Sequence, residues 1–349
     1  MTHEQQKTIQ TYSLMIIATV LFGAAMTWLK PVLIPFVLSL MLTAGLTPMV
    51  QWLSRRLKCP EWMTILLTLG VGVVVFLGLS VLVGQSLQTA VAKTDEFEAR
   101  LTGVYEAALT QLAQFGLPLE TTSIKSHLQS LPIGKAFGSI ATHLLNVLSD
   151  SFLVIFFMIY LLQSALSRSK DIDPNSISQR IHTRVRQYLA IKMGLSILTG
   201  ILVWITLVAF GVPMAAMFGV LTVVLNFIPS VGSIVAVLLP LPFIALDPAF
   251  SIGAILTILA ITMTVQMIVG NVLEPKMMGE LLELHPITIL VALVFWGTMW
   301  GVPGMFLAVP LTAVVSILLY EFPPTRGIAL LFSGKTESVN STKGAVDNE

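Results

Sequence analysis

Residues 193–273 contain a single formally charged side chain, Asp247, so this stretch cannot form a water-exposed globular surface. The segment from Asn226 to Gly232 interrupts it, and the segment from Gly270 to Lys276 closes it. Lipid offers no hydrogen-bond partner to a bare N–H or C=O group, so irregular backbone at membrane depth must be buried in protein or line a wet cavity. In transporters, such breaks often mark a binding site. We therefore predict a membrane protein with broken helices.

The composition agrees, because charged residues make up 11% of the chain against about 25% in ordinary soluble domains. A length of 349 residues accommodates about eight spans of roughly 20 residues and one modest extramembrane domain. The predicted fold class is an all-α, polytopic helical membrane protein with broken or re-entrant segments in its C-terminal half and a helical extramembrane insert. One cysteine, Cys59, excludes an internal disulfide and a multi-cysteine metal site, and we expect neither a metal nor a cofactor.

The N-terminal part divides into spans and an insert. Residues 1–84 contain three long apolar runs, which predict the first three membrane spans. Over residues 85–143 the hydropathy falls, and apolar residues recur at three- and four-residue steps from Leu87 to Phe115. That spacing indicates an amphipathic helical extramembrane domain, lying on the membrane or against a partner. A solvated helical hairpin that only links two spans is an equal alternative.

Basic residues predict the orientation. Residues 144–188 read as a fourth span and a basic loop, and basic side chains continue from Arg180 to Lys192. Positively charged loops stay in the cytoplasm because Lys and Arg near span ends resist translocation. The basic segment around Arg55 falls on the same side, and residues 323–349 read as a polar tail. We therefore predict that both termini are cytoplasmic.

Residues 189–322 are predicted to form the transport core. Several of their apolar segments are shorter than the roughly 20 residues that a helix needs to cross a membrane. We expect residues 214–225 and 234–246 to form one unit broken at Pro229, and residues 287–300 and 305–320 to form another broken between Gly301 and Gly304. Similar Gly-Val-Pro triplets begin at Gly211 and Gly301, which is either an internal repeat of the kind found in secondary transporters or a chance similarity of apolar segments.

Three irregular segments resemble a known family. They run from Leu225 to Ile234, from Gly270 to Gly279, and from Trp296 to Thr312. In this order they are similar to the hallmark segments of the autoinducer-2 exporter (AI-2E) family of bacterial inner-membrane proteins. The resemblance implies an oligomeric, multispan transporter. Members of the family are associated with export of a quorum-sensing furanone signal or with sodium–proton exchange. Ser230 and the acidic segment from Glu280 to Leu284 depart from the family pattern.

Glu274 is the sharpest candidate for a site residue. A charged acid at bilayer depth costs about 2.5–3.5 kcal/mol on insertion scales, so it needs a partner or water. Lys276 is a nearby charge. If Glu274 is buried, it is able to bind Na⁺ or carry a proton. The alternative is that Glu274 and Lys276 form an ordinary pair in an aqueous loop.

The remaining candidates surround the two breaks. Asn226 and Asn271 either contact a solute or cap freed backbone ends, and the prolines and the glycine shape the turns. The complete predicted set for substrate or ion binding is Asn226, Pro229, Gly232, Asn271, Glu274, Pro275 and Lys276.

The predicted function is a secondary transporter or exporter of a small polar solute, such as autoinducer-2, working by alternating access. No His-Glu-x-x-His, Walker or dinucleotide-binding motif occurs, so we expect neither an enzyme nor ATP-driven transport. The expected partners are the lipid bilayer, the solute or ion, and further copies of the chain, without nucleic acid. The alternatives are a sodium–proton antiporter of the same family and a non-transporting membrane scaffold.

Overall fold

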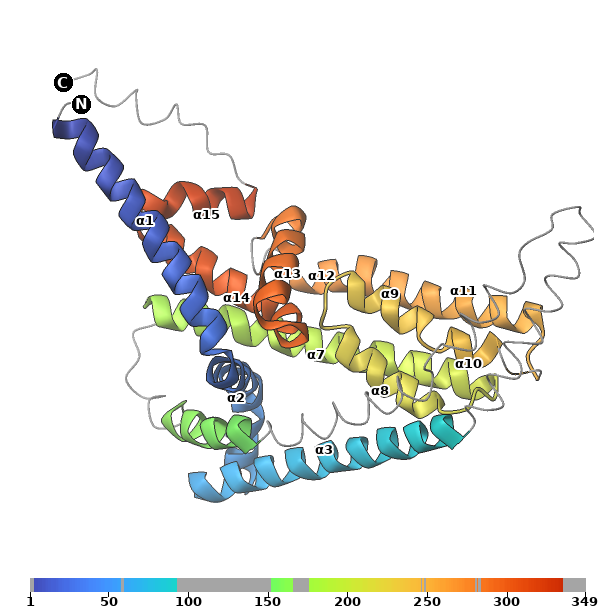
Figure 1. Ribbon diagram of the computed structural model, residues 1–349. Coiled ribbons are helices and arrows are strands. Elements are labelled where there is room, and N and C mark those ends of the chain that lie inside the picture. The colour runs from blue at the N-terminus through green and yellow to red at the C-terminus, as the bar shows by residue number, and fades with distance from the viewer. Residues whose placement is uncertain are drawn as a thin grey trace, which may run out of the picture. The chain divides into compact units, whose positions relative to one another are not determined.

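The computed structural model describes residues 3–57, 60–92, 152–165, 176–245, 247, 249–279, 281 and 284–334. Every regular element in those ranges is helical (Figure 1). Five of the helical stretches are long and apolar enough to cross a membrane, namely Lys30–Thr47, Trp62–Ser86, Ile177–Ala209, Ile252–Met278 and Val302–Glu321. Shorter apolar helices accompany them. The predicted polytopic helical membrane fold is confirmed.

The predicted insert over residues 85–143 lies outside the described residues from residue 93 onward. Its first residues continue the long helix α3, Glu61–Ala92. The fourth predicted span is described only as the helix Phe152–Ala165. The tail predicted from residue 323 begins with two helical elements, η3 (Pro323–Thr325) and α15 (Arg326–Ser333), and lies outside the described residues from residue 335.

The chain divides into two compact units. The described part of the first unit contains α1 (His3–Trp28), α2 (Lys30–Leu57), the start of α7 (Ile177–Ala209), α13 (Pro286–Trp300), α14 (Val302–Glu321) and α15. Its core joins Met41 and Ala44 of α2 to Trp300 and Leu307. The Trp300 Nε1–H group donates a hydrogen bond to the Met26 carbonyl oxygen at 3.2 Å, which connects α13 to the end of α1.

Gly301 alone separates α13 from α14, at the predicted break between Gly301 and Gly304. Its φ of 68° lies in the region that favours glycine. The first turns of α7 differ from the prediction, because the basic residues expected in a loop are helical there. Arg180 in these turns forms an ion pair with Glu321 at the end of α14. A helix therefore continues beyond the apolar span, and Arg180 has an acidic partner there.

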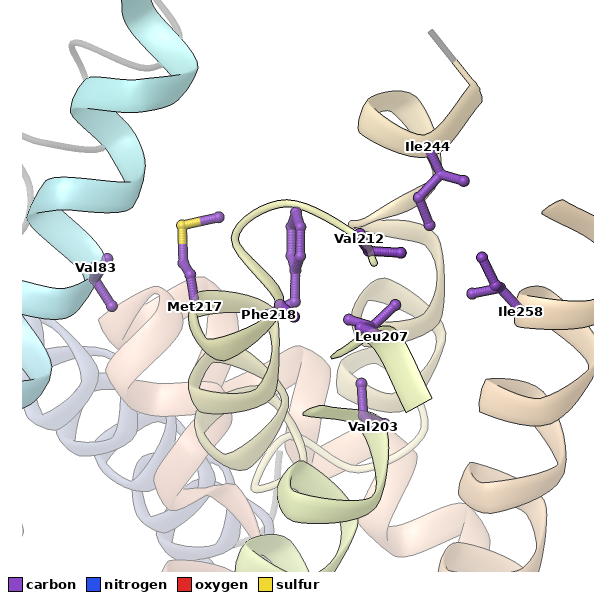
Figure 2. Close-up of a cluster of buried hydrophobic side chains, with 9 residues drawn as sticks. Val83, Val203, Leu207, Val212, Met217, Phe218, Ile244 and Ile258 are labelled. Carbon is purple, nitrogen blue, oxygen red and sulfur yellow. The ribbon is translucent and has the colours of Figure 1, made fainter. Parts of the chain in front are cut away.

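The second unit contains most of α3, the rest of α7, and α8 (Ala215–Leu225), α9 (Val231–Leu238), α10 (Leu241–Ala245) and α11 (Ile252–Ile268), followed by the helical turns up to Met277. Figure 2 shows its hydrophobic core, where Leu207 of α7, Phe218 of α8 and Ile258 of α11 converge. All three side chains are buried. This cluster sets the position of three helices relative to one another inside the second unit.

The middle of helix α7 buries polar side chains and exposes large apolar ones, the reverse of the usual pattern in a soluble protein. Lys192, Ser196 and Thr199 are buried, whereas Ile197, Ile201 and Ile205 are exposed. An exposed apolar stripe of this length suits lipid, because acyl chains contact it without a hydrophobic cost. Burial of the polar stripe requires partners from neighbouring helices.

Helices α7 and α8 approach closely where small residues face each other. A Cβ atom added at Gly200 of α7 would lie 2.3 Å from Val223 Cγ2 and 2.7 Å from the Gly219 carbonyl oxygen of α8. Glycine permits this backbone approach, as is common at helix contacts in membranes.

The predicted break around Pro229 is present. Helix α8 ends at Leu225, α9 begins at Val231, and Ser230 between them has a φ of 58°. A Cβ atom at Gly232 would lie 1.7 Å from the Leu225 carbonyl oxygen. Only glycine fits where the chain folds back this tightly.

The second predicted break, from Gly270 to Lys276, is not unwound chain. It continues α11 as the π-helix η2 (Val269–Leu273), followed by α12 (Glu274–Met278). Pro275 lacks an N–H group and would clash with the preceding turn of a regular α-helix. The wider π-helical turn takes an i to i−5 bond, from the Glu274 N–H to the Val269 carbonyl oxygen, and so carries the helix to the proline.

We expect Gly200→Ala to destabilise the protein, because its methyl group would overlap Val223 and the backbone of α8. Overpacking of a tight contact costs about 1–3 kcal/mol. Gly194→Ala, on the same helix with nothing within 4 Å of the added atom, is the matched control. Thermal unfolding of the two variants in detergent measures the difference, and equal midpoints would show that α7 and α8 are not packed as described.

Candidate functional site

Helix α7 carries a buried stripe of side chains that changes from polar to apolar along the helix. Its members are spaced by three or four residues and so lie on one face of the helix. The first three are polar and the last two are apolar, in the order Lys192, Ser196, Thr199, Val203 and Leu207. Lys192 is only 3% exposed.

Helices α8 and α11 show the same change. On α8, buried Phe218 is followed at four-residue steps by buried Thr222 and Asn226. On α11, buried Ile258 is followed at the same steps by Thr262 and Gln266. The apolar members, Phe218 and Ile258, belong to the hydrophobic core of the second unit (Figure 2).

Contacts between the helices bring the polar ends of these stripes together. The Asn226 Nδ2–H group of α8 donates to Ser196 Oγ of α7 at 3.2 Å. The Lys192 ammonium of α7 contacts Glu274 Oε1 at the start of α12, with 2.5 Å between the nitrogen and the oxygen. At the other end of the stripe, Leu207 and Ile258 share the hydrophobic cluster. The α11–α12 run is therefore antiparallel to α7.

The π-helix η2 allows Glu274 to meet Lys192 while Ile258 shares the hydrophobic cluster with Leu207. The chain from Ile258 to Glu274 is one residue longer than the chain from Leu207 back to Lys192. A π-helical turn takes in one residue more than an α-helical turn, so η2 absorbs the difference and directs Glu274 to the side that faces Lys192. The π-helix thus has a positioning role in the site.

We call these eight residues the polar core: Lys192, Ser196, Thr199, Thr222, Asn226, Thr262, Gln266 and Glu274. Three hydroxyl groups in it donate to their own helices, from Thr199 to the Leu195 carbonyl, from Thr222 to the Phe218 carbonyl, and from Thr262 to the Ile258 carbonyl. A hydroxyl oxygen whose hydrogen is engaged in this way retains lone pairs that accept hydrogen bonds. The polar core is therefore rich in acceptors.

The Lys192–Glu274 ion pair is the charged end of the polar core. The Lys192 side chain is 3% exposed and that of Glu274 is 23% exposed. Isolated charges taken out of water cost several kcal/mol each, which only close pairing offsets. Lys276, the partner expected from the sequence, is exposed, whereas Lys192 comes from a helix far away in the sequence. The carboxylate therefore joins α7 to the α11–α12 run.

The other predicted site residues have separate positions. Asn226 is buried and ends α8, so it caps the helix and also contacts Ser196. Gly232 is buried and Pro229 is half-buried in the turn. Asn271 and Pro275 are exposed, and they lie on the outer side of the helical run that contains Glu274. Asn226 and Glu274 thus contact side chains of α7, whereas Asn271 is exposed and takes no part in these contacts.

Lys192, Ser196 and Gln266 were not among the predicted site residues. The sequence contains a weak indication of two of them, because Lys192, Ser196 and Thr199 have helical spacing. Lys192 is also the last charged residue before the apolar stretch. Gln266 is one amide among apolar residues. Among the residues that the structure describes, no group of three or more His, Cys, Asp or Glu side chains forms a metal site.

This arrangement, a helical membrane protein with a largely buried ion pair and buried amide groups, is typical of membrane transport proteins. The sequence profile described as AI-2E family transporter matches residues 16–323. The chain belongs to this family of transporters.

Individual relatives agree with the family assignment. The chain is 26% identical over 312 residues to the AI-2 transport protein TqsA of Escherichia coli, covering 86% of this chain and 89% of that protein. It is 29% identical over 330 residues to a putative transport protein of Haemophilus influenzae, covering 90% of this chain and 94% of that protein. The predicted resemblance is confirmed.

Removing one partner of the ion pair should destabilise the protein. Breaking a fully buried pair costs about 3–5 kcal/mol, and the partial exposure of Glu274 reduces this, so we expect about 2 kcal/mol for Lys192→Met or Glu274→Gln. The double variant should recover part of the loss, because neither charge is then left alone. Lys276→Gln is the control. Thermal midpoints of all four variants measure the coupling, and unchanged midpoints in both single variants would contradict it.

Proposed function

We propose that this transporter is a secondary transporter that carries a small polar solute across the bacterial inner membrane by alternating access, with Glu274 as the coupling site. The ion pair between buried Lys192 and half-buried Glu274 is the observation that carries the proposal. Ionisable side chains inside a membrane are costly and mark ion and substrate pathways. A purely structural helix contact is formed at lower cost by apolar or small residues.

The geometry suggests how coupling works. Lys192 already supplies a positive charge to the Glu274 carboxylate, so a proton or Na⁺ arriving at that oxygen competes with the ammonium group. When the cation binds, the contact between α7 and the α11–α12 run weakens. When it leaves, the contact re-forms. A switch of this kind favours two arrangements of the helices that differ in one ion pair, as alternating access requires.

The tight turns give this motion a mechanical basis. Helix α8 and helix α9 are joined by a short turn that contains Ser230, and Gly232 lies in the first turn of α9. Both helices are shorter than a membrane span. In secondary transporters, discontinuous helices form the binding site, and alternating access is a rigid-body movement of one helix bundle against another. Pro229 and Gly232 then act through the shape of the turn.

Similarity to the AI-2 transport protein TqsA supports autoinducer-2 as the first solute to test, with export as the direction and quorum sensing as its context. The proposal includes cytoplasmic termini, consistent with the basic residues in the first turns of α7, and assembly into a homo-oligomer. Sodium–proton exchange is a second candidate, because a membrane carboxylate paired with a buried ammonium group is suited to exchanging Na⁺ for a proton. We expect no catalytic activity.

Transport by the protein reconstituted in liposomes tests the proposal. We expect Glu274→Gln to reduce flux of autoinducer-2, or ²²Na⁺ uptake against a proton gradient, by roughly tenfold or more, the effect of losing an interaction worth about 1.4 kcal/mol. Asn226→Ala should reduce flux too, because it removes the contact with Ser196. Asn271→Ala should have a smaller effect, since Asn271 is exposed.

Lys276→Gln is the control for a charge change near Glu274, and each variant is compared by its elution profile in detergent to confirm folding. Wild-type flux in a folded Glu274→Gln variant would remove the coupling assignment. Wild-type liposomes without flux of either probe would favour the scaffold alternative instead.

A further inference from the structure

Gln266 is buried without a hydrogen-bond partner. Its side chain is 7% exposed, and among the residues that the structure describes neither the amide nitrogen Nε2 nor the amide oxygen Oε1 has a hydrogen-bond partner. Buried amide groups without partners are rare because each unmade hydrogen bond destabilises the folded protein. The bonding capacity of this amide is therefore available to a partner other than the described residues of the chain.

The register of the helices shows which groups lie at the level of Gln266. Counting back from the shared cluster of Ile258 and Leu207, Gln266 of α11 comes level with Thr199 of α7. The contacts from Gly200 to Gly219 and from Ser196 to Asn226 bring Thr222 of α8 to the same level. Three helices thus contribute polar side chains at one depth.

These neighbours offer mainly acceptors. The hydroxyl hydrogens of Thr199, Thr222 and Thr262 are engaged with their own helices, so their oxygens retain lone pairs that are able to accept hydrogen bonds. Gln266 adds one acceptor and the two N–H bonds of its Nε2 group. Above this level lies the hydrophobic cluster with Phe218 and below it the Lys192–Glu274 pair.

This set of groups suits a small neutral molecule that carries hydroxyl groups. A hydroxyl group both donates and accepts, so it pairs with the two unpaired atoms of Gln266 and with the threonine oxygens. A bare cation would satisfy Oε1 and leave Nε2 unpaired in a buried site. The charged groups nearby are already paired with each other, so an ionic solute has no counter-charge at this level.

We propose that Gln266, together with Thr199, Thr222 and Thr262, forms the solute site of this transporter and binds a small neutral solute through its hydroxyl groups. The site is distinct from the coupling site at Glu274. The proposal rests on the transport function proposed above, and it makes Gln266 the residue that selects for hydroxyl groups.

The first experiment separates binding from stability. In Gln266→Leu the unpaired amide is replaced by an apolar side chain of similar size, so the thermal midpoint should stay the same or rise. Flux in liposomes, measured with radiolabelled glycerol, erythritol and ribose, should nevertheless fall by roughly tenfold or more. Met267→Leu is the matched control, because Met267 is the next residue on α11 and is 65% exposed. Unchanged flux in a stable Gln266→Leu variant would overturn the proposal.

The second experiment detects the site without relying on transport. Cys59 is the only cysteine in the sequence, so Cys59→Ser gives a background in which Gln266→Cys is the single thiol. We expect a membrane-impermeant thiol reagent to label this variant, and glycerol, erythritol or ribose to slow the labelling. Met267→Cys should remain unlabelled because it faces lipid.

The outcomes distinguish the two proposals. Protection of Gln266→Cys by a polyol, in a protein that shows no flux, would support the solute site and contradict the transport function. Flux that depends on Glu274 but not on Gln266 would support the transport function and overturn the solute site. Labelling that Na⁺ slows and the polyols do not would overturn the choice of a neutral solute.

Discussion

The absence of hydrogen-bond partners in lipid is the constraint on which this structure depends. Polar side chains on a membrane helix must find partners inside the protein. In the second unit they do so on one side of each helix, where the Asn226–Ser196 hydrogen bond and the Lys192–Glu274 ion pair join α7 to α8 and to the α11–α12 run. The exposed faces remain apolar and suit contact with lipid.

Local backbone geometry makes these contacts possible. Gly200 lets α7 and α8 approach, Gly232 lets α9 fold back on α8, and the π-helix brings Glu274 round to face Lys192. Each feature is unfavourable for an isolated helix, since glycine lowers helix propensity and π-helical turns are rare. They are retained where polar groups from separate helices have to meet within hydrogen-bond distance, and this is why the irregular segments of the chain coincide with its polar core.

The polar core contains two kinds of polar group with different consequences for function. Lys192 and Glu274 satisfy each other, so any change in their pairing alters the contact between two helices. Gln266 has no hydrogen-bond partner in the described part of the chain, so in our proposal its amide binds the solute. The transport mechanism that we propose uses both kinds, because a carrier binds its solute and links that binding to a movement.

The sequence by itself determined the class of fold, the family, and the turns around Pro229 and between α13 and α14, because hydropathy, charge and the Gly-Pro pattern act locally. It also identified Glu274 as a costly acid. It placed the partner of that acid wrongly at Lys276 and missed Gln266, because sequence proximity does not show which helix faces which. Only the tertiary structure decided that Lys192 pairs with Glu274 and that the region before Pro275 is π-helical. The physical reason is that pairing across helices depends on their register, which the packing of Leu207, Phe218 and Ile258 fixes.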